Sequence, residues 1–239
     1  MSADEQPIAS VWTRPRRQRE QLSREQIVSE AVALLDAEGL EALSMRRLGT
    51  RLGAGATSLY RHVANKDELI ELVVDEVYGE LEVPAADEAA GWRSAAGRSG
   101  ASLRSMALRH PWVASVLGQV GLAHLGPNVM RMSERMLAVF KSAGFAPDEA
   151  DQAMSTLIAY VIGMATSEAA YLSLIARSGK SEQEFVESLR TSQERLRLPE
   201  GQAVQHGKDP RQIREDNFDY GLQRVLDGLE ARLRSTNGQ

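Results

Sequence analysis

Apolar residues recur at three- and four-residue spacing along most of this 239-residue chain, from about residue 23 to residue 233. This spacing is typical of amphipathic helices, whose apolar stripe faces a core. No stretch shows the strand-like alternation of β-branched and polar residues. The pattern therefore predicts an all-α fold.

The first predicted helix begins at Ser23 and ends at Glu38. Ser23 and Gln26 have the spacing of a capping box, in which each side chain bonds the backbone N–H of the other residue. Gly39 follows the last apolar position, and glycine is common just after a helix end. Both boundaries of this helix are thus predicted from local chemistry.

Two short helices that meet at a glycine come next. Ser44 is a good N-cap for the first, and Gly53 can take the positive φ that ends it. The second runs from roughly Gly55 to His62. This arrangement is typical of a helix-turn-helix. Its apolar anchors are Met45, Leu48, Leu52, Leu59 and Val63.

A fourth helix begins after Asn65, a good N-cap, and is stopped by Pro84. The first domain therefore closes near residue 83. Because the fourth helix starts beside the helix-turn-helix and ends at the next domain, we take it as the candidate lever between the two. Its stripe is Leu69, Leu72, Val73, Val77 and Leu81.

The remaining chain is predicted to form a larger helical domain over residues 84–239. Pro147 suits the first position of a long helix. The predicted helices are Trp92–His110, Trp112–Leu117, Val129–Ala143, Pro147–Arg177 and Glu215–Leu233, with a loop at Gly118–Pro127 and a mobile loop at 191–210.

Charge is distributed unevenly along the chain. The net charge is −5, yet residues 1–66 hold 10 Lys and Arg against 8 Asp and Glu, whereas the remainder holds 18 against 25. An acidic body with one basic end confines attraction for nucleic acid to one surface. There is no cysteine, which excludes disulfides and thiolate zinc sites.

A run of arginines surrounds Pro15, and we assign residues 1–22 to a basic, flexible arm before the domain of residues 23–83. Such an arm can reach phosphates or a narrow minor groove. A solvated, disordered tail is the alternative, and the sequence leaves both open. The arginines are Arg14, Arg16, Arg17, Arg19 and Arg24.

The segment Leu59–Lys66, with Leu69 after it, resembles the recognition-helix signature of the tetracycline-repressor (TetR) family of bacterial transcription regulators. The resemblance implies an N-terminal three-helix DNA-binding domain, joined through a fourth helix to a ligand-binding and dimerisation domain. It covers about residues 23–233. Its later landmarks are His110-Pro111-Trp112, Gly126-Pro127, Tyr160–Gly163, Phe218–Leu222 and Gly228-Leu229.

The outer face of the helix-turn-helix carries small and hydrogen-bonding side chains, which suit close approach to a major groove. Ala56 allows that approach but cannot bond a base. The predicted DNA-binding residues are Ser44, Ala56 and Arg61, with Arg46, Thr57 and Ser58 at base edges and Tyr60, His62 and Lys66 at phosphates.

The resemblance also implies a small-molecule effector within the second domain. Methionine and aromatic side chains line adaptable apolar pockets, although at helical spacing they are more often plain core. The candidates are Trp92, Met106, His110, Trp112, His124, Met130, Met136, Met154, Tyr160, Met164 and Tyr171.

His124 lies in a stretch that resembles the one where tetracycline repressors place a magnesium-ligating histidine. Pro127 and Asn128 stand where those proteins have Thr and Arg. We therefore predict no metal site and no cofactor.

We interpret the chain as a cytoplasmic, ligand-responsive regulator that binds a pseudo-palindromic operator on double-stranded DNA as a homodimer, most simply as a repressor. Gly163, Gly221 and Gly228 would permit close helix approach in a dimer. The alternative is a small-molecule binding or sequestering protein with a vestigial helix-turn-helix. No catalytic motif indicates an enzyme, and the longest apolar run, Leu157–Ala165, is too short to span a membrane.

Overall fold

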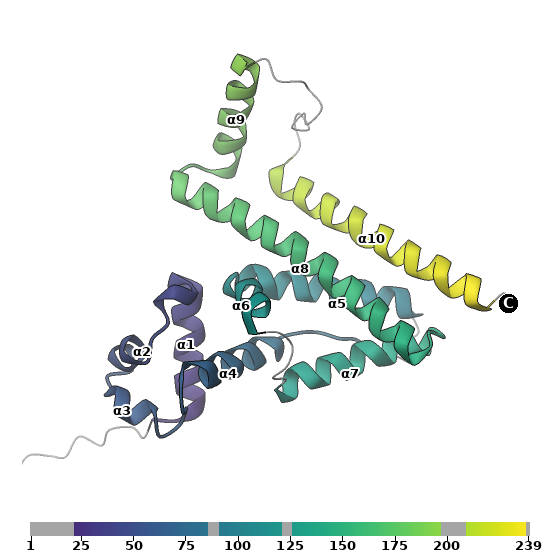
Figure 1. Cartoon of the computed structure of the whole chain (residues 1–239). Coiled ribbons are helices and arrows are strands. Elements are labelled where there is room, and N and C mark those ends of the chain that lie inside the picture. Colours follow the sequence, from purple (N-terminus) through teal and green to yellow (C-terminus); the bar gives the residue numbers. More distant parts are fainter. Residues whose placement is uncertain (1–21, 86–90, 121–125, 197–208, 238–239) are drawn as a thin grey trace, which may run out of the picture.

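The structure is a computed structural model that describes residues 22–85, 91–120, 126–196 and 209–237. Over these ranges the chain is helical and has no strand, which confirms the all-α prediction (Figure 1). The elements are α1 (Arg24–Glu38), the 3₁₀ turn η1 (Leu40–Ala42), α2 (Met45–Arg51), α3 (Ala56–Leu59), α4 (Lys66–Tyr78), α5 (Gly91–Arg109), α6 (Trp112–Val120), α7 (Pro127–Ser142), α8 (Pro147–Ser178), α9 (Glu182–Leu196) and α10 (Pro210–Asn237).

Local capping sets the starts of the N-terminal helices as predicted. The Ser23 hydroxyl accepts from the Gln26 backbone N–H at 3.2 Å, and the Gln26 side chain accepts from the Ser23 backbone N–H at 3.0 Å. Ser44 accepts from the Arg47 N–H, which starts α2. Gly53 ends the turn after α2 with a φ of +60°.

The second helix of the helix-turn-helix is shorter than predicted, because α3 ends at Leu59 and not at His62. The backbone N–H groups of His62 and Val63 both donate to the Leu59 carbonyl, so the chain turns there. This turn returns Val63 to the core, where its side chain is buried.

The fourth helix is also shorter than its predicted apolar stripe. The side chain of Asn65 caps α4 as predicted, but the helix ends at Tyr78, and Leu81 lies beyond it. The Asn128 side-chain amide donates to the Asp75 carbonyl at 3.0 Å, and the Gly79 backbone N–H donates to the same oxygen at 3.1 Å.

Asp75 joins α4 to α7. Its Oδ1 accepts from the backbone N–H groups of Asn128 and Val129 at 2.8 and 3.0 Å, so a side chain of α4 caps the first turn of α7. A side chain on Gly126 would clash with the Asp75 carboxylate. Pro127 is the first residue of α7, so the predicted loop at Gly118–Pro127 is wrong at this end.

The same loop is wrong at its other end, because α6 continues to Val120. Residues 121–125 lie outside the described residues. The C-terminal helices α5, α7, α8 and α10 pack around one core. Its buried side chains include Met106, Phe140, Leu157 and Phe218.

The predicted mobile loop at 191–210 is wrong at both ends. Residues 191–196 belong to α9, and α10 begins at Pro210, five residues before the predicted start at Glu215. Ser181 and Glu184 form a second capping box before α9, and Asp209 accepts from the Arg211 backbone N–H at the start of α10. Residues 197–208 are outside the described residues.

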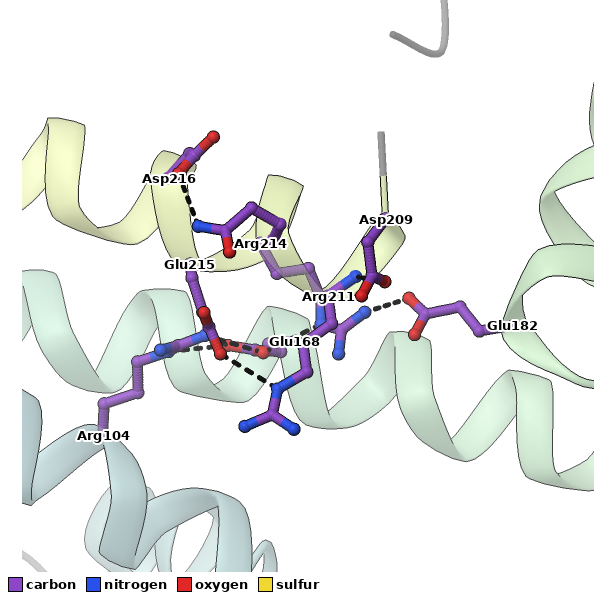
Figure 2. A network of polar contacts seen from close by, with 9 residues as sticks. Arg104, Glu168, Glu182, Asp209, Arg211, Arg214, Glu215 and Asp216 are labelled. Carbon is purple, nitrogen blue, oxygen red and sulfur yellow. Dashed lines mark hydrogen bonds and ion pairs between the residues drawn. The ribbon is translucent and has the colours of Figure 1, made fainter. Parts of the chain in front are cut away.

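A chain of ion pairs ties α9 to the other C-terminal helices (Figure 2). Both guanidinium groups of Arg104 on α5 and Arg214 on α10 bond the Glu168 carboxylate of α8, at 2.8 and 3.0 Å. Arg214 also bonds Glu182 of α9. The side chains of these four residues are largely buried, so the network fixes α9 at the meeting point of α8 and α10.

The helix α8 carries an 18-residue stretch with a mean hydropathy of 1.4 and is long and apolar enough to cross a membrane by length and composition alone. Core helices of soluble proteins have the same properties. Here α8 packs against α5, α7, α9 and α10 and carries the doubly paired Glu168.

The packing of α10 on α8 depends on Gly221. The Tyr160 hydroxyl of α8 donates to the Phe218 carbonyl of α10 at 2.8 Å. A Cβ atom on Gly221 would overlap the Tyr160 ring and hydroxyl. The sequence suggested that Gly221 serves a dimer, but its contact partner is in the same chain.

We predict that Gly221→Ala lowers the free energy of unfolding by about 1–3 kcal/mol, because the Tyr160 ring must shift and lose its hydrogen bond. Gly97→Ala is the matched control: it lies on α5, its Cβ would meet only Leu226 at 3.9 Å, and it should stabilise by about 0.5–1 kcal/mol. Urea unfolding measures both. Equal effects of the two substitutions would contradict this packing.

Candidate nucleic-acid interface and inner cavity

The helix-turn-helix presents polar side chains to solvent. Tyr60 is 52% exposed, although aromatic residues are usually buried. Arg46, Thr57, Arg61 and Lys66 are also exposed. The remaining predicted DNA-binding residues contribute less surface: Ala56, Ser58 and His62 are half-buried, and the hydroxyl of the exposed Ser44 caps α2.

Two arginines of this region are committed to intramolecular ion pairs. Arg47 bonds Glu38, and Arg51 bonds both Glu30 and Glu38, so two carboxylates of α1 hold α2. Arg24 donates to the His62 carbonyl at 3.1 Å and lies near Glu68. These cations are neutralised within the chain.

Three other cations differ from this set. Within the described residues, Arg46, Arg61 and Lys66 have no acidic partner. They lie on α2, in the turn after α3 and in the first turn of α4. All three are among the residues predicted from the sequence to contact DNA, and their charge is available to a phosphate backbone.

A small apolar cavity lies between α5, α7, α8 and the segment that follows α4. Its volume is about 10 Å³, which is room for about one water. Drug-sized ligands occupy pockets of about 300–1,000 Å³, so a guest must displace side chains. The lining residues are Leu81, Val83, Ser99, Gly100, Leu103, Met132, Met136, Leu157 and Ile158.

Of the ligand candidates from the sequence, Met136 lines this cavity. Met106 and Met154 are buried in the core, and Met164 is half-buried against it. Trp92 packs its ring on Phe140 and Phe145.

The other candidates lie elsewhere. Tyr160 packs on α10 and Tyr171 on Phe185 of α9, whereas Met130 is 50% exposed on α7. His110 and Trp112 lie against α1, and His124 is outside the described residues. The structure therefore brings few of these side chains together.

Sequence reasoning missed most of the cavity lining. Leu103, Leu157 and Ile158 occupy ordinary apolar helix positions, so no local signal separates them from core residues. It also missed Asp36, Asp75 and Glu80, because an acidic residue on a helix surface looks solvated until its tertiary partner is known.

Two family models match the chain. "Bacterial regulatory proteins, tetR family" matches residues 27–73, and "Tetracyclin repressor-like, C-terminal domain" matches residues 83–233. The transcriptional repressor DrrR1 of Streptomyces coeruleorubidus is 34% identical over 221 residues, which cover 91% of this chain and 81% of that protein.

Solved structures agree. The Streptomyces coelicolor TetR family protein ActR in complex with actinorhodin superposes with a TM-score of 0.70 at 32% identity, covering 88% of this chain and 96% of that one. BioQ with its double-stranded DNA operator gives a TM-score of 0.60 at 25% identity, covering 87% and 98%.

The fold and the matches define a helix-turn-helix transcriptional regulator with a helical C-terminal domain. The chain belongs to the TetR family. Regulators of this family are not enzymes, as the sequence predicted.

Proposed function

We propose that the chain is a cytoplasmic repressor that binds a pseudo-palindromic operator as a dimer and leaves it when a small-molecule inducer is bound. The observation that carries this proposal is a set of three cations on an exposed helix-turn-helix, Arg46, Arg61 and Lys66, that have no acidic partner among the described residues. The similarity of the chain to the repressor DrrR1 supports repression over activation.

At the operator, Arg46, Thr57 and Ser58 read base edges in the major groove. Tyr60, His62 and Lys66 lie toward phosphates, which position the protein without carrying sequence information. Similarity to BioQ, which was solved with its operator, supports this arrangement.

Lys66→Ala should make operator binding less salt-dependent. Loss of one phosphate contact lowers the magnitude of the slope of log K against log salt by roughly 0.9, and a dimer loses one contact in each chain, which makes roughly 1.8 in all. Lys141→Ala on α7 removes the same charge from an exposed position outside the helix-turn-helix and should leave the slope unchanged. Fluorescence anisotropy on a duplex from upstream of its own gene measures both slopes. If the two variants have equal slopes, Lys66 does not contact a phosphate.

The surface of α8 supports a dimer. Only 17% of its most apolar stretch is buried within one chain, although exposing such a stretch to water is unfavourable. Gly163 on α8 and Gly228 on α10 face open space, and Leu174 and Tyr220 on the same helices are exposed. A four-helix packing of α8 and α10 with a second copy would cover these groups.

Gly163→Arg should therefore dissociate the dimer, because a charged side chain would enter a close helix contact. Ala138→Arg introduces the same side chain at an exposed position of α7 and should leave the dimer intact. Light scattering should give twice the 26.2 kDa of one chain for wild type and for Ala138→Arg. A wild-type mass of one chain would contradict the proposal.

We place the effector in the apolar cavity between α5, α7 and α8. Its two thioethers, Met132 and Met136, can adopt other rotamers and so admit a larger guest. ActR was solved with actinorhodin, which makes actinorhodin the first probe to use here. Binding releases the operator only if the effector favours one of two conformations over the other.

Met136→Trp should abolish actinorhodin binding measured by calorimetry, because the larger ring fills the cavity. Met130→Trp on the exposed face of the same helix is the control and should bind as wild type does. Circular dichroism checks that both variants are folded. Equal binding by the two variants would place the guest outside this cavity.

A further inference from the structure

A buried histidine lies where the C-terminal helices meet the N-terminal ones. His110 follows the last residue of α5, and its side chain is 8% exposed. Its Nδ1 lies 2.7 Å from Oδ1 of Asp36 on α1, and its Nε2 lies 3.2 Å from Oε1 of Glu80, just after α4. One imidazole ring therefore bridges two elements of the N-terminal part.

The Asp36 carboxylate also holds the start of α6. The indole Nε1–H of Trp112, the first residue of α6, donates to Oδ1 of Asp36 at 2.7 Å. Trp112 is 4% exposed, whereas the Asp36 side chain is 32% exposed, so the bond is partly buried. The end of α5 and the beginning of α6 thus converge on a single atom of α1.

The last turn of α1 extends this contact to α2, the first helix of the helix-turn-helix. Glu38, two residues after Asp36, bonds Arg47 and lies 3.8 Å from Arg51, and both arginines belong to α2. We call His110–Trp112, where α5 ends and α6 begins, the α5–α6 corner. A displacement of this corner that moves Asp36 therefore also moves Glu38, which holds α2. This is a contiguous physical link between the two parts.

The charge of the ring decides whether all these bonds can form. A neutral imidazole has one N–H donor, whereas an imidazolium has two. Both ring nitrogens face carboxylate oxygens, so only the imidazolium can donate to Asp36 and Glu80 together. Among the described residues, the other charged group that contacts this cluster is Arg109, which bonds Glu80 at 2.5 Å.

Glu80 stays ionised in this cluster. Burial alone would raise the pKa of its carboxyl, but the Arg109 guanidinium and His110 outweigh burial and lower it. Each ring nitrogen of His110 therefore faces a carboxylate. When the imidazolium loses a proton, one of the two carboxylates loses its N–H donor.

We propose that Asp36 is the positioning residue through which the α5–α6 corner sets the orientation of the helix-turn-helix, and that a charged His110 closes this contact. The proposal rests on the DNA-binding function proposed above. It differs from the link made by Asp75, which bonds backbone N–H groups that do not titrate.

The first test is the indole ¹H–¹⁵N resonance of Trp112, identified with Trp112→Phe, over the range of about pH 5–8 in which histidine changes charge. In wild type this resonance should titrate. Asp36→Asn keeps an oxygen acceptor for the indole but removes the carboxylate beside Nδ1 of His110, so the change of the resonance with pH should be smaller. His110→Gln should show no inflection. A wild-type resonance that does not titrate overturns the proposal.

The second test is operator affinity at about pH 6 and pH 8, by anisotropy on the duplex from upstream of its own gene. All proteins carry His62→Gln, which removes the histidine of the DNA interface. The two Kd values should differ by about fivefold or more in this background, and adding His110→Gln or Asp36→Asn should abolish that difference. Asp75→Asn should preserve it.

An unchanged pH difference in both added variants overturns the proposal. Failure of the parent protein to bind any DNA sequence would instead refute the proposed function, and the indole titration still tests the contact itself. Thermal melting of His110→Gln and Asp36→Asn confirms that lost coupling is not lost folding.

Discussion

The burial of α4 between two groups of helices constrains the whole molecule. Leu69, Val73 and Val77 are fully buried, and they belong to one apolar cluster that extends from α1 to α10. The helix-turn-helix therefore has no separate core of its own that would let it turn freely. Because interiors pack at crystal-like density, a change in the C-terminal helices must be accommodated at α4 or at the contacts beside it.

Those contacts are polar and specific. Asp75 caps α7, Asp36 contacts His110 and Trp112, and Glu80 contacts His110 and Arg109, so carboxylates of the N-terminal part make these contacts. Carboxylates on α1 also pair with two arginines of α2: Glu38 bonds Arg47, and Glu30 bonds Arg51. The cations of the helix-turn-helix that these carboxylates do not neutralise, Arg46, Arg61 and Lys66, are the ones available to DNA.

The sequence predicted those features that depend on neighbours along the chain. The caps at Ser23, Ser44 and Asn65 are bonds over three residues, and the structure contains all three. The resemblance at Leu59–Lys66 led to the correct family. The capping box at Ser181 is the same kind of local signal, so the start of α9 was also predictable from the sequence.

Features that depend on tertiary packing were not predictable in this way. The length of α3 is set by the return of Val63 to the core, and Gly221 is required by Tyr160 on another helix. Residue type predicts methionines and aromatic residues as ligand contacts, yet Trp112 bonds Asp36 of α1, and Leu103 and Leu157 line the cavity. Residue type alone does not tell which apolar side chains border a void.

The most direct test of the central claim is selection of bound duplexes from a random library by the full-length protein. A dimeric regulator of this fold should enrich an inverted repeat whose half-sites are about one helical turn, roughly 10 base pairs, or a multiple of a turn apart. Enrichment of a single asymmetric site would contradict the dimeric arrangement. No enrichment at all would contradict sequence-specific DNA binding by this chain.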